Sequence, residues 1–543
     1  MVEAFNQGPG PLISALYDQL KIGQTIDEMV RWDPVQCRLS PGTRIKAMVI
    51  NIFSRQRPLY RLYESFEYMD IENLFGRGIH RDDLTDYNIA RALDKLGERG
   101  PWEIFSTICM RAICHEEIKL KYLHSDTTSI SLYGTYEDQN GREFIITNGH
   151  SKDRRPDLKQ FLYGLSVTPD KVPVCADVKS GNTSDKAWNF EFIEKLAESL
   201  DPKLLQNVIY VADSALVTKD NLKRIGKHRL KFISRLPGNF SLEKGLKAKA
   251  WENEAAFQTL GCFSDKKDAA SYRVQEFKEK LYGKHYRFLV VHSTKLDGRK
   301  TRSLQKDLAR REKELQKAIL QLEKQVFACE PDAKSALEEF KKHNQEDFFP
   351  LTGGIEIQEK RKPGRPGKNT PAKEIYRLKL QYTTDEAAVQ KAKERLSCFV
   401  LITNLDETYT APHIVKEYKG QSSVETSFKF LKDPMFVGPI YLKKPQRVEA
   451  LAYVLLIALL IFGILERRVR EAMKHESEPL IVQGRVKTFR PTGRRILELL
   501  ETVLVMTTDD PYRRAFSSRY KVPRVLSLAG FEPDIYLDIR DGP

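Results

Sequence analysis

Two aspartates in this sequence stand where a carboxylate can do chemistry. Asp126 lies inside a β-strand pattern, and Asp213 follows the apolar run from Val208 to Ala212. The carboxyl end of a buried strand is where α/β sheets place their sites. A structural role stays open for Asp213, because an aspartate in this position can also cap the next helix.

A third carboxylate, Glu425, lies in the segment YKGQSSVETSFKFLK, residues 418 to 432. If this segment is one helix, a single stripe runs along it, made of Tyr418, Gln421, Glu425 and Lys432. Tyr418 and Lys432 would then lie about 10 Å to either side of Glu425, where they can contact successive phosphates of a DNA strand. A solvated polar face is the alternative, and Gly420 interrupts the helical pattern.

Asp126, Asp213 and Glu425 together suit phosphodiester cleavage. That reaction needs an activated water or hydroxyl on one side and a neutralised leaving oxygen on the other, and two divalent ions supply both. Mg²⁺, or Mn²⁺ in its place, prefers carboxylate oxygens. The chain has no phosphate-binding loop, no dinucleotide-binding glycine motif and no His-Glu-x-x-His. We therefore expect two metal ions held by these three acids.

Composition favours a nucleic-acid partner. The 543 residues carry a net charge of +15, enough chain for several domains and a balance that suits a polyanion. A basic protein with no anionic partner is the alternative. Seven scattered cysteines without a Cys-x-x-Cys pair indicate a reducing, cytoplasmic setting. The first residues show no signal peptide, and the apolar run from Ala450 to Leu465 is short for a membrane span, so we expect a core helix there.

Residues 1 to about 115 have a helical pattern. Ser40-Pro41 marks one helix start, and Thr85 can cap another helix that stops at Gly97. These helices are either a DNA reader resembling a helix-turn-helix or an ordinary bundle. The arginines expected on their exposed faces are Arg55, Arg57, Arg61 and Arg91.

From residue 120 the pattern changes to a mixed α/β sheet. A helix is expected from Asp185 to Leu200 and another from Lys219 to Ile225. The runs expected to form strands are YLHSDTTSISLYG, EFIITNG, QFLYGLSVT, VPVCADVKSG, NVIYVADS and KFISRLP, and the sheet resumes at EIYRLKLQY and CFVLITNL.

A large insertion separates the two parts of this sheet. It contains a charged helix with an apolar stripe, for which an intramolecular hairpin and a modest dimer contact are both open. The segment KRKPGRPGKNTP, 360 to 371, is a basic linker or resembles an AT-hook, in which Arg361 and Arg365 would contact an A·T-rich minor groove. The predicted division is an N-terminal helical, DNA-binding domain at 1–115, a catalytic domain at 116–240 and 396–475, the insertion at 241–395, and a basic tail at 476–543.

The acidic motifs resemble those of bacterial insertion-sequence DDE transposases. SDTTSISLYG, VADSALVTKDNL and the helix with Glu425 look like the three motifs of the insertion sequence four superfamily, sixteen-thirty-four-like group. Its signature is Tyr, two residues, Arg, three residues, Glu, six residues, Lys. This chain matches the spacing, with Gln421 in place of Arg. Gln can hydrogen-bond a phosphate but brings no charge.

The resemblance implies an RNase H-like catalytic domain interrupted by an insertion. It assigns the metal ligands to Asp126, Asp213 and Glu425. It further implies double-stranded DNA as partner, both element ends and target, a homodimer on DNA, and a bacterial, nucleoid-associated location. The DNA contacts that it implies are Tyr418, Gln421 and Lys432, with His150 and Lys152 in the stretch GHSKDRRPDLKQFLYG.

Some questions stay open at this stage. Some relatives of this group close a DNA end into a hairpin and hold a flipped base on a tryptophan of the insertion. Trp251 is the tryptophan of this insertion, and ordinary core packing is the alternative role. The expected function is cleavage of element ends and their joining to target DNA. A DNA-binding relative without catalysis, or a nuclease that cuts without joining, are the alternatives.

Overall fold

The computed structural model describes residues 3–54, 57–137, 143–263, 269–295, 298–344, 346–360, 373–507, 514–517 and 521–539. It contains two compact units. Unit 1 comprises Met1–Arg235 and Thr403–Pro543, and unit 2 comprises Leu236–Ile402. Arg55, Arg361 and Arg365, with the AT-hook-like segment, lie outside the described residues.

After a first short strand, unit 1 is helical from Gly10 to His115, and two helix starts lie where the pattern predicts them. Ser40 Oγ accepts a hydrogen bond from Thr43 N at 3.0 Å, and Thr85 caps its helix in the same way through Asn88 N. The second of these helices continues beyond Gly97, because the left-handed residue that ends it is Gly100, at φ +98°. The helices are α1 (Gly10–Gln19), α2 (Ile22–Met29), α3 (Pro41–Phe53), α4 (Ile71–Phe75), α5 (Asp86–Arg99) and α6 (Pro101–His115).

The sheet of unit 1 has the strand order β4-β3-β2-β5-β6. β2 pairs antiparallel with β3 and parallel with β5, and β5 pairs parallel with β6. The run EFIITNG, expected as a strand, contributes one isolated bridge, between Thr147 and Gln160. The strands are β2 (Tyr122–Leu132), β3 (Lys159–Val167), β4 (Pro173–Ser180), β5 (Ile209–Ala212) and β6 (Lys231–Arg235).

Helices cover both faces of this sheet. A Cβ on Gly164 of β3 would lie 1.8 Å from Trp188, so α7 packs directly against the strand there. The neighbouring Tyr163 donates to Ala452 O of α16 at 2.9 Å. Because successive strand residues point to opposite faces, α7 and α16 lie on opposite sides of β3. The helices are α7 (Asp185–Ser199), α8 (Pro202–Asn207), α9 (Lys219–Lys227) and α16 (Pro445–Ala472).

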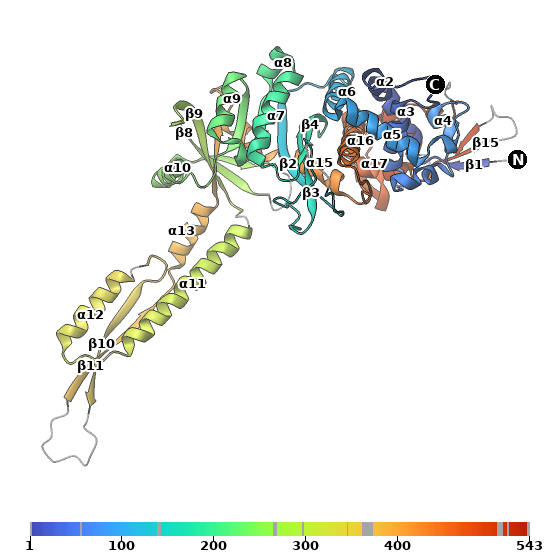
Figure 1. Cartoon of the computed structure of the whole chain (residues 1–543). Helices are drawn as coiled ribbons and strands as arrows, with labels where there is room; N and C mark the ends of the chain where they lie inside the picture. Colours follow the sequence, from blue (N-terminus) through green and yellow to red (C-terminus); the bar gives the residue numbers. More distant parts are fainter. Residues whose placement is uncertain are drawn as a thin grey trace. The chain divides into compact units, whose positions relative to one another are not determined.

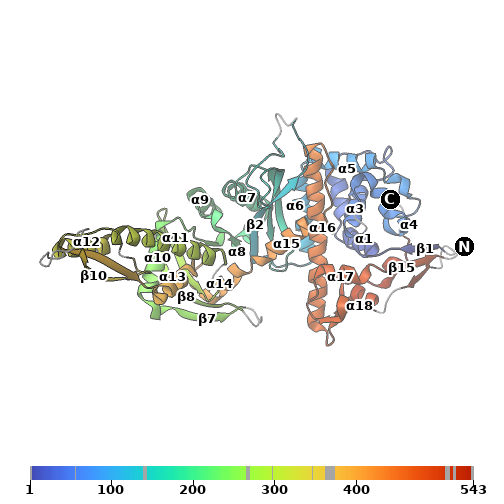
Figure 2. The same ribbon diagram turned by 90° about the horizontal axis from the view of Figure 1, so that it is seen from below.

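The apolar helix α16 is a core helix, as predicted. It is long and apolar enough to cross a membrane, yet 89% of its most apolar 18-residue stretch is buried inside the protein. Figure 2 shows it running between the sheet with β2 and the helices α3 and α5. Arg447 near its start forms a two-pronged ion pair with Asp94 of α5, at 2.7 and 2.6 Å. The amino-terminal helices, α16 and the sheet therefore share one hydrophobic core.

Residues 476–543, expected as a basic tail, also contribute to this core. Ile496, Leu497 and Val525 are buried in it, and Tyr536 donates to Gly8 O at 2.7 Å. A small sheet of order β1-β15-β16 joins the two ends of the chain. The elements are β1 (Glu3–Asn6), β13 (Leu480–Val482), β14 (Val486–Thr488), α17 (Gly493–Leu500), β15 (Leu504–Thr507), β16 (Arg514–Ser517) and α18 (Lys521–Leu528).

Unit 2 has two parts. One is a sheet of order β12-β9-β8-β7 with α10, in which Trp251 packs against Phe257 and His292. The other is the antiparallel hairpin β10–β11 with α11 and α12 (Figure 1). Bounds are α10 (Ser241–Glu252), β7 (Gln258–Cys262), β8 (Ser271–Leu281), β9 (Lys284–Ser293), α11 (Gly298–Glu323), α12 (Glu330–His343), β10 (Leu351–Lys360), β11 (Lys373–Tyr382), α13 (Glu386–Leu396) and β12 (Cys398–Thr403).

Two expectations for this region are settled by the packing. The strand EIYRLKLQY is β11, and it pairs with β10 rather than resuming the catalytic sheet. The apolar stripe of α11 packs within the unit, since Leu315, Ile319 and Leu322 form one buried cluster with residues of α12 and β11. The intramolecular alternative for this stripe is therefore the one observed.

Candidate active site

Asp126 and Asp213 lie side by side on the two neighbouring central strands of the unit 1 sheet, at the carboxyl end of β5. In the parallel pair β2–β5, Ser125 is opposite Ala212, and each aspartate is the next residue along its strand. Neighbouring strands are about 4.8 Å apart, so this register places the two aspartates next to each other. Asp213 also caps a short 3-10 turn, accepting from Ala215 N at 3.0 Å. Asp213 therefore caps this turn, the structural alternative for it, while also standing beside Asp126.

The surroundings of the two carboxylates raise the pKa of both. Burial raises the pKa of Asp126 to about 6; Lys152 opposes the rise, and Asp213 and Asp185 add to it. Burial also raises the pKa of Asp213, against the hydrogen bond from Ala215 and with a further contribution from Asp185. Like charges in a half-buried position are relieved by a bound cation, so this donor set fits a divalent metal ion.

Lys152 contacts this acidic cluster through the loop that precedes β3. Its Nζ donates to Thr127 O at 2.7 Å and lies 3.3 Å from Asp185 Oδ2 and 4.0 Å from Asp126 Oδ1. Thr127 Oγ1 in turn donates to Asp185 Oδ1 at 2.5 Å. One ammonium group thus partly neutralises a cluster of aspartates.

The segment expected as one helix forms two helices, α14 (Ala411–Lys419) and α15 (Ser422–Lys432). The break falls at Gly420 and Gln421, which both keep right-handed helical backbone angles, so the segment is an interrupted helix rather than one continuous helix. Gly420 rests against His124 of β2, where a Cβ would lie 2.6 Å from the ring. This close approach holds the junction against the strand that carries Asp126.

Tyr418 lies near both aspartates. Burial raises the pKa of its hydroxyl to about 12; Arg235 opposes the rise, and Asp213 and Asp126 add to it. Gln421 follows at the junction, where its amide nitrogen is buried and has no hydrogen-bond partner among the described residues. An arginine of the family signature would place a charge at this position.

Glu425 is in the first turn of α15 and is exposed. Its helix packs against β2. Within the described ranges, no group of three or more His, Cys, Asp or Glu side chains is close enough to hold a metal ion. The structure therefore brings together Asp126 and Asp213, with Tyr418 and Lys152, but does not close Glu425 onto them.

The remaining residues predicted to contact DNA are Lys432 and His150. Lys432, at the end of α15, lies 2.6 Å from Asp153 Oδ1. His150 is exposed and is held through its main-chain oxygen, which accepts from Gln160 Nε2 at 3.4 Å. Lys432 and Lys152 are thus tied to acids of the protein, and a DNA phosphate would compete with those acids.

Asp185 and Arg235 belong to this site and were missed in the sequence. Asp185 follows Ser184, which caps α7, and a Ser-Asp pair at a helix start is explained by capping alone. The signal that could have found Asp185 is its place in GNTSDKAWNF, a stretch that resembles the transposase group. Arg235 ends a strand next to Asp213's strand, and the β-α-β pattern could have suggested it.

Residues 126–461 match the family model described as "Transposase DDE domain", which covers more than half of the sequence. The chain belongs to the DDE transposase family. The matched range contains Asp126, Asp213 and Glu425. The amino-terminal helices of this transposase match a second model, "Domain of unknown function (DUF4277)", over residues 10–110.

No curated protein matches this transposase. Among solved structures, a similar chain is that of the "Cryo-EM structure of piggyBac transposase synaptic complex with hairpin DNA". The TM-score is 0.40 at 10% sequence identity, and the match covers 91% of this chain and 80% of that chain.

Proposed function

We propose that this transposase cleaves DNA at the ends of a mobile element and joins those ends to target DNA. The observation that carries the proposal is the register of β2 and β5, which places Asp126 beside Asp213 inside the matched family domain. Asp126, Asp213 and Glu425 would hold two Mg²⁺ or Mn²⁺ ions. Such ions activate the attacking oxygen and neutralise the leaving one.

The protein's own residues have separate tasks in this proposal. Asp126, within β2, and Asp213, directly after β5, would hold the metal ions, which would bind the reacting phosphate. Glu425 stands on α15, and its movement toward the aspartates would complete the site when DNA binds. Tyr418, Gln421, Lys152 and Lys432 would contact phosphates on either side.

The finer assignments are part of the same proposal. The spacing of the signature residues supports the sixteen-thirty-four-like group of insertion-sequence enzymes, and with it a bacterial, cytoplasmic protein bound at the nucleoid. An RNase H-like domain and a homodimer on DNA follow from that group. The basic linker with Arg361 and Arg365 would add contacts to A·T-rich DNA, and His150 would add one beside Lys152.

The test is incubation of the protein with candidate element ends and Mg²⁺ or Mn²⁺, followed by analysis of each strand. Cleavage adds water across a P–O3′ bond and frees a 3′ hydroxyl. In joining, that hydroxyl attacks a target phosphate in place of water, which forms a new P–O bond, breaks the target's P–O3′ bond and releases the target's 3′ hydroxyl. We expect both products, and both should disappear when the divalent metal is chelated.

Two other functions would give different products. A nuclease of this fold would yield cut ends with no joined product. An end-binding protein without catalysis would shift the DNA in a gel and leave both strands intact. A protein that neither binds nor cuts DNA would contradict the proposal altogether.

A further inference from the structure

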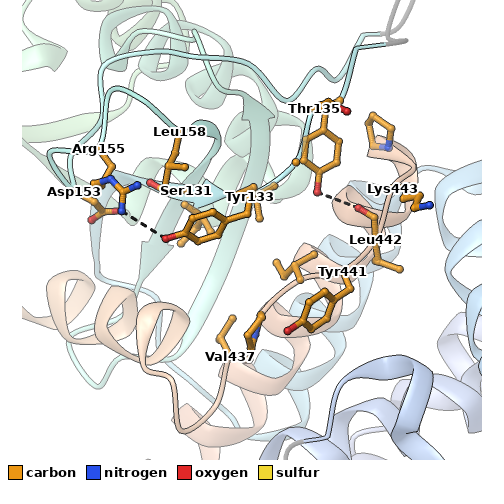
Figure 3. Close-up of a pocket in the computed structure, with 18 of the residues that line it drawn as sticks. Ser131, Tyr133, Thr135, Asp153, Arg155, Leu158, Val437, Tyr441, Leu442 and Lys443 are labelled. Carbon is orange, nitrogen blue, oxygen red and sulfur yellow. Dashed lines mark hydrogen bonds between the residues drawn. The ribbon is translucent and has the colours of Figure 1, made fainter.

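A large groove lies in unit 1 beside the end of α15. Its volume is about 1550 Å³, beyond the 300–1,000 Å³ or so of common small-molecule pockets. One wall is the end of β2 with the segment that follows it, and the other is the connection from α15 to α16 (Figure 3). We name it the tyrosine groove and define it by Tyr133, Arg155, Leu158, Lys432, Tyr441 and Lys443.

Two tyrosine rings of this groove are left in solvent. Tyr133 is 73% exposed and Tyr441 is 63% exposed, although large aromatic side chains gain most from burial. Both rings are supported from one side. Arg155, which is paired with Asp157, donates to the hydroxyl of Tyr133 at 3.5 Å, and the rings of Tyr60 and Tyr441 meet edge to face with their centroids 5.9 Å apart. Supported, solvent-exposed rings of this kind can stack on a flat partner.

The groove is also basic. Its lining includes four cations, Arg155, Lys432, Lys443 and Lys444, and two acids, Glu137 and Asp153, and Arg155 is paired with Asp157 just outside the lining. Lys432 is paired with Asp153. Lys443 and Lys444 are exposed and form no ion pair with any residue of the described part of the chain. Both can therefore reach a phosphate, although Arg447 lowers the pKa of Asp94 and Lys444 lies close enough to that carboxyl to lower it further.

The two walls are connected to each other. Tyr136, buried next to the exposed Tyr133, donates from its hydroxyl to Leu442 O at 3.0 Å. Leu442 follows Tyr441 directly, so this hydrogen bond fixes the spacing of the two segments that carry the exposed rings (Figure 3).

The groove adjoins the candidate active site through α15. Lys432 belongs to the lining and lies seven residues after Glu425 in the same helix. At 1.5 Å per residue this separation is about 10 Å. A DNA strand with its reacting phosphate at Glu425 would therefore continue over the groove within a few nucleotides.

We propose that the tyrosine groove holds the unpaired strand of an opened element end, with bases stacked on Tyr133 and Tyr441 and phosphates at Lys443 and Lys444. The inference rests on the proposed function. Duplex DNA offers phosphates to the lysines but keeps its bases stacked inside. Unpaired bases offer flat faces, and aromatic side chains bind them with little regard to sequence. Exposed rings together with unpaired lysines thus favour a single strand over a duplex.

The test compares two labelled DNAs of one sequence, a blunt duplex and the same duplex with a single-stranded overhang of about six nucleotides. Affinity for the full-length protein is measured by fluorescence anisotropy. The variant Tyr133→Ala/Tyr441→Ala should lose about 5- to 150-fold for each stacked base on the overhang DNA, and should bind the blunt duplex as the parent does. The control Tyr133→Phe/Tyr441→Phe keeps the rings and should keep the preference.

A second readout uses the parent protein and 2-aminopurine in the overhang, whose fluorescence should fall on stacking. Unchanged fluorescence, or an equal loss of affinity on both DNAs, would overturn the inference. So would an Ala variant that keeps the full overhang preference, which would leave the groove to another partner, such as a peptide. If the parent binds neither DNA, the proposed function itself fails; if it cuts element ends without any overhang preference, only the groove assignment fails.

Discussion

Lys152 Nζ lies 4.0 Å from Oδ1 of Asp126. An ammonium group therefore stands beside a carboxylate at which we propose that a metal ion binds. Both side chains are about one-third exposed, at 28% for Lys152 and 33% for Asp126, so solvent screens their attraction only in part. In the absence of metal, the lysine is the nearest charge that offsets the aspartate cluster.

Removal of this charge should make the fold more dependent on metal. We expect Lys152→Met to lower the stability of the metal-free protein at pH 8 by about 1 kcal/mol or less, the range for a partly exposed ion pair. Added Mg²⁺ should then stabilise the variant more than the parent, because it relieves a larger repulsion. Thermal melting with and without Mg²⁺ measures both effects. The control is Lys429→Met on α15, and an equal Mg²⁺ effect in all three proteins would refute the idea.

Substitution of the three acids separates catalysis from binding. Asp126→Ala, Asp213→Ala and Glu425→Ala should each reduce cleavage by roughly 10³-fold or more, while DNA affinity stays close to that of the parent. Asp185→Ala, which acts through Lys152 and Thr127, should cost roughly 10- to 100-fold. Strand-resolved gels measure cleavage. Full activity of Glu425→Ala would remove Glu425 from the site, as would a metal-loaded DNA complex with its carboxylate more than about 10 Å from either aspartate.

Gln421 offers a test of the family signature. Replacement by arginine restores the charge at that position, and the buried amide nitrogen of Gln421 has no partner among the described residues to lose. We expect Gln421→Arg to tighten DNA binding and to steepen the log–log salt dependence by about 0.9, the value of one phosphate contact. Binding titrations at several salt concentrations measure the slope. An unchanged slope would show that no phosphate reaches this residue, and a parent slope near zero would contradict the polyanion partner.

Glu449, which is not one of the proposed metal ligands, should make the stability of the fold depend on pH. Burial and the nearby Asp177 raise its pKa from 4.5 to about 7, while Lys195 and Lys179 act in the opposite direction. The folded protein thus binds this proton more tightly than the unfolded chain, and the stability it provides is present below pH 4.5 and lost as pH rises through about 7.

The variant Glu449→Gln removes that loss because its amide does not ionise. We expect a higher melting temperature than the parent at pH 8 and a much smaller difference near pH 5. Glu198→Gln, at an exposed residue of α7, is the control and should show no such trend. A variant that melts at or below the parent at pH 8 would contradict the raised pKa.

The pair Asp126 and Asp213 could be predicted because its information is local. Each residue follows or interrupts a run of β-branched and apolar residues, and strands in sequence order tend to be neighbours in a sheet. Ser40 and Thr85 were equally readable, since a cap and its helix lie within four residues. The core role of α16 was predicted from the short apolar run Ala450 to Leu465, but the helix itself is long enough to cross a membrane and its burial is what identifies it as a core helix.

Features that depend on distant contacts could not be predicted. The residue pattern of EIYRLKLQY identifies a strand. Its pairing with β10 could not be predicted, because it depends on how the chain folds. Gly420 marks an interruption of the helical pattern in the sequence, but its close approach to His124 is seen only in the fold. Tyr133 and Tyr441 face one groove from segments some 300 residues apart in sequence, so neither gives a signal alone. Asp185 was hidden by its capping position.

The position of α16 bears on how proteins of this kind evolve. One helix is packed against α3 and α5 on one side and against β4 on the other, and Arg447 bonds it to Asp94. Two sequence families meet in this chain, at 10–110 and 126–461, yet the helix that both need is encoded near the end of the second. A gene fusion that exchanged only the first segment would present α16 with a surface it does not fit. Lineages with this architecture should therefore inherit the two segments together, and their substitutions in α3, α5 and α16 should be correlated.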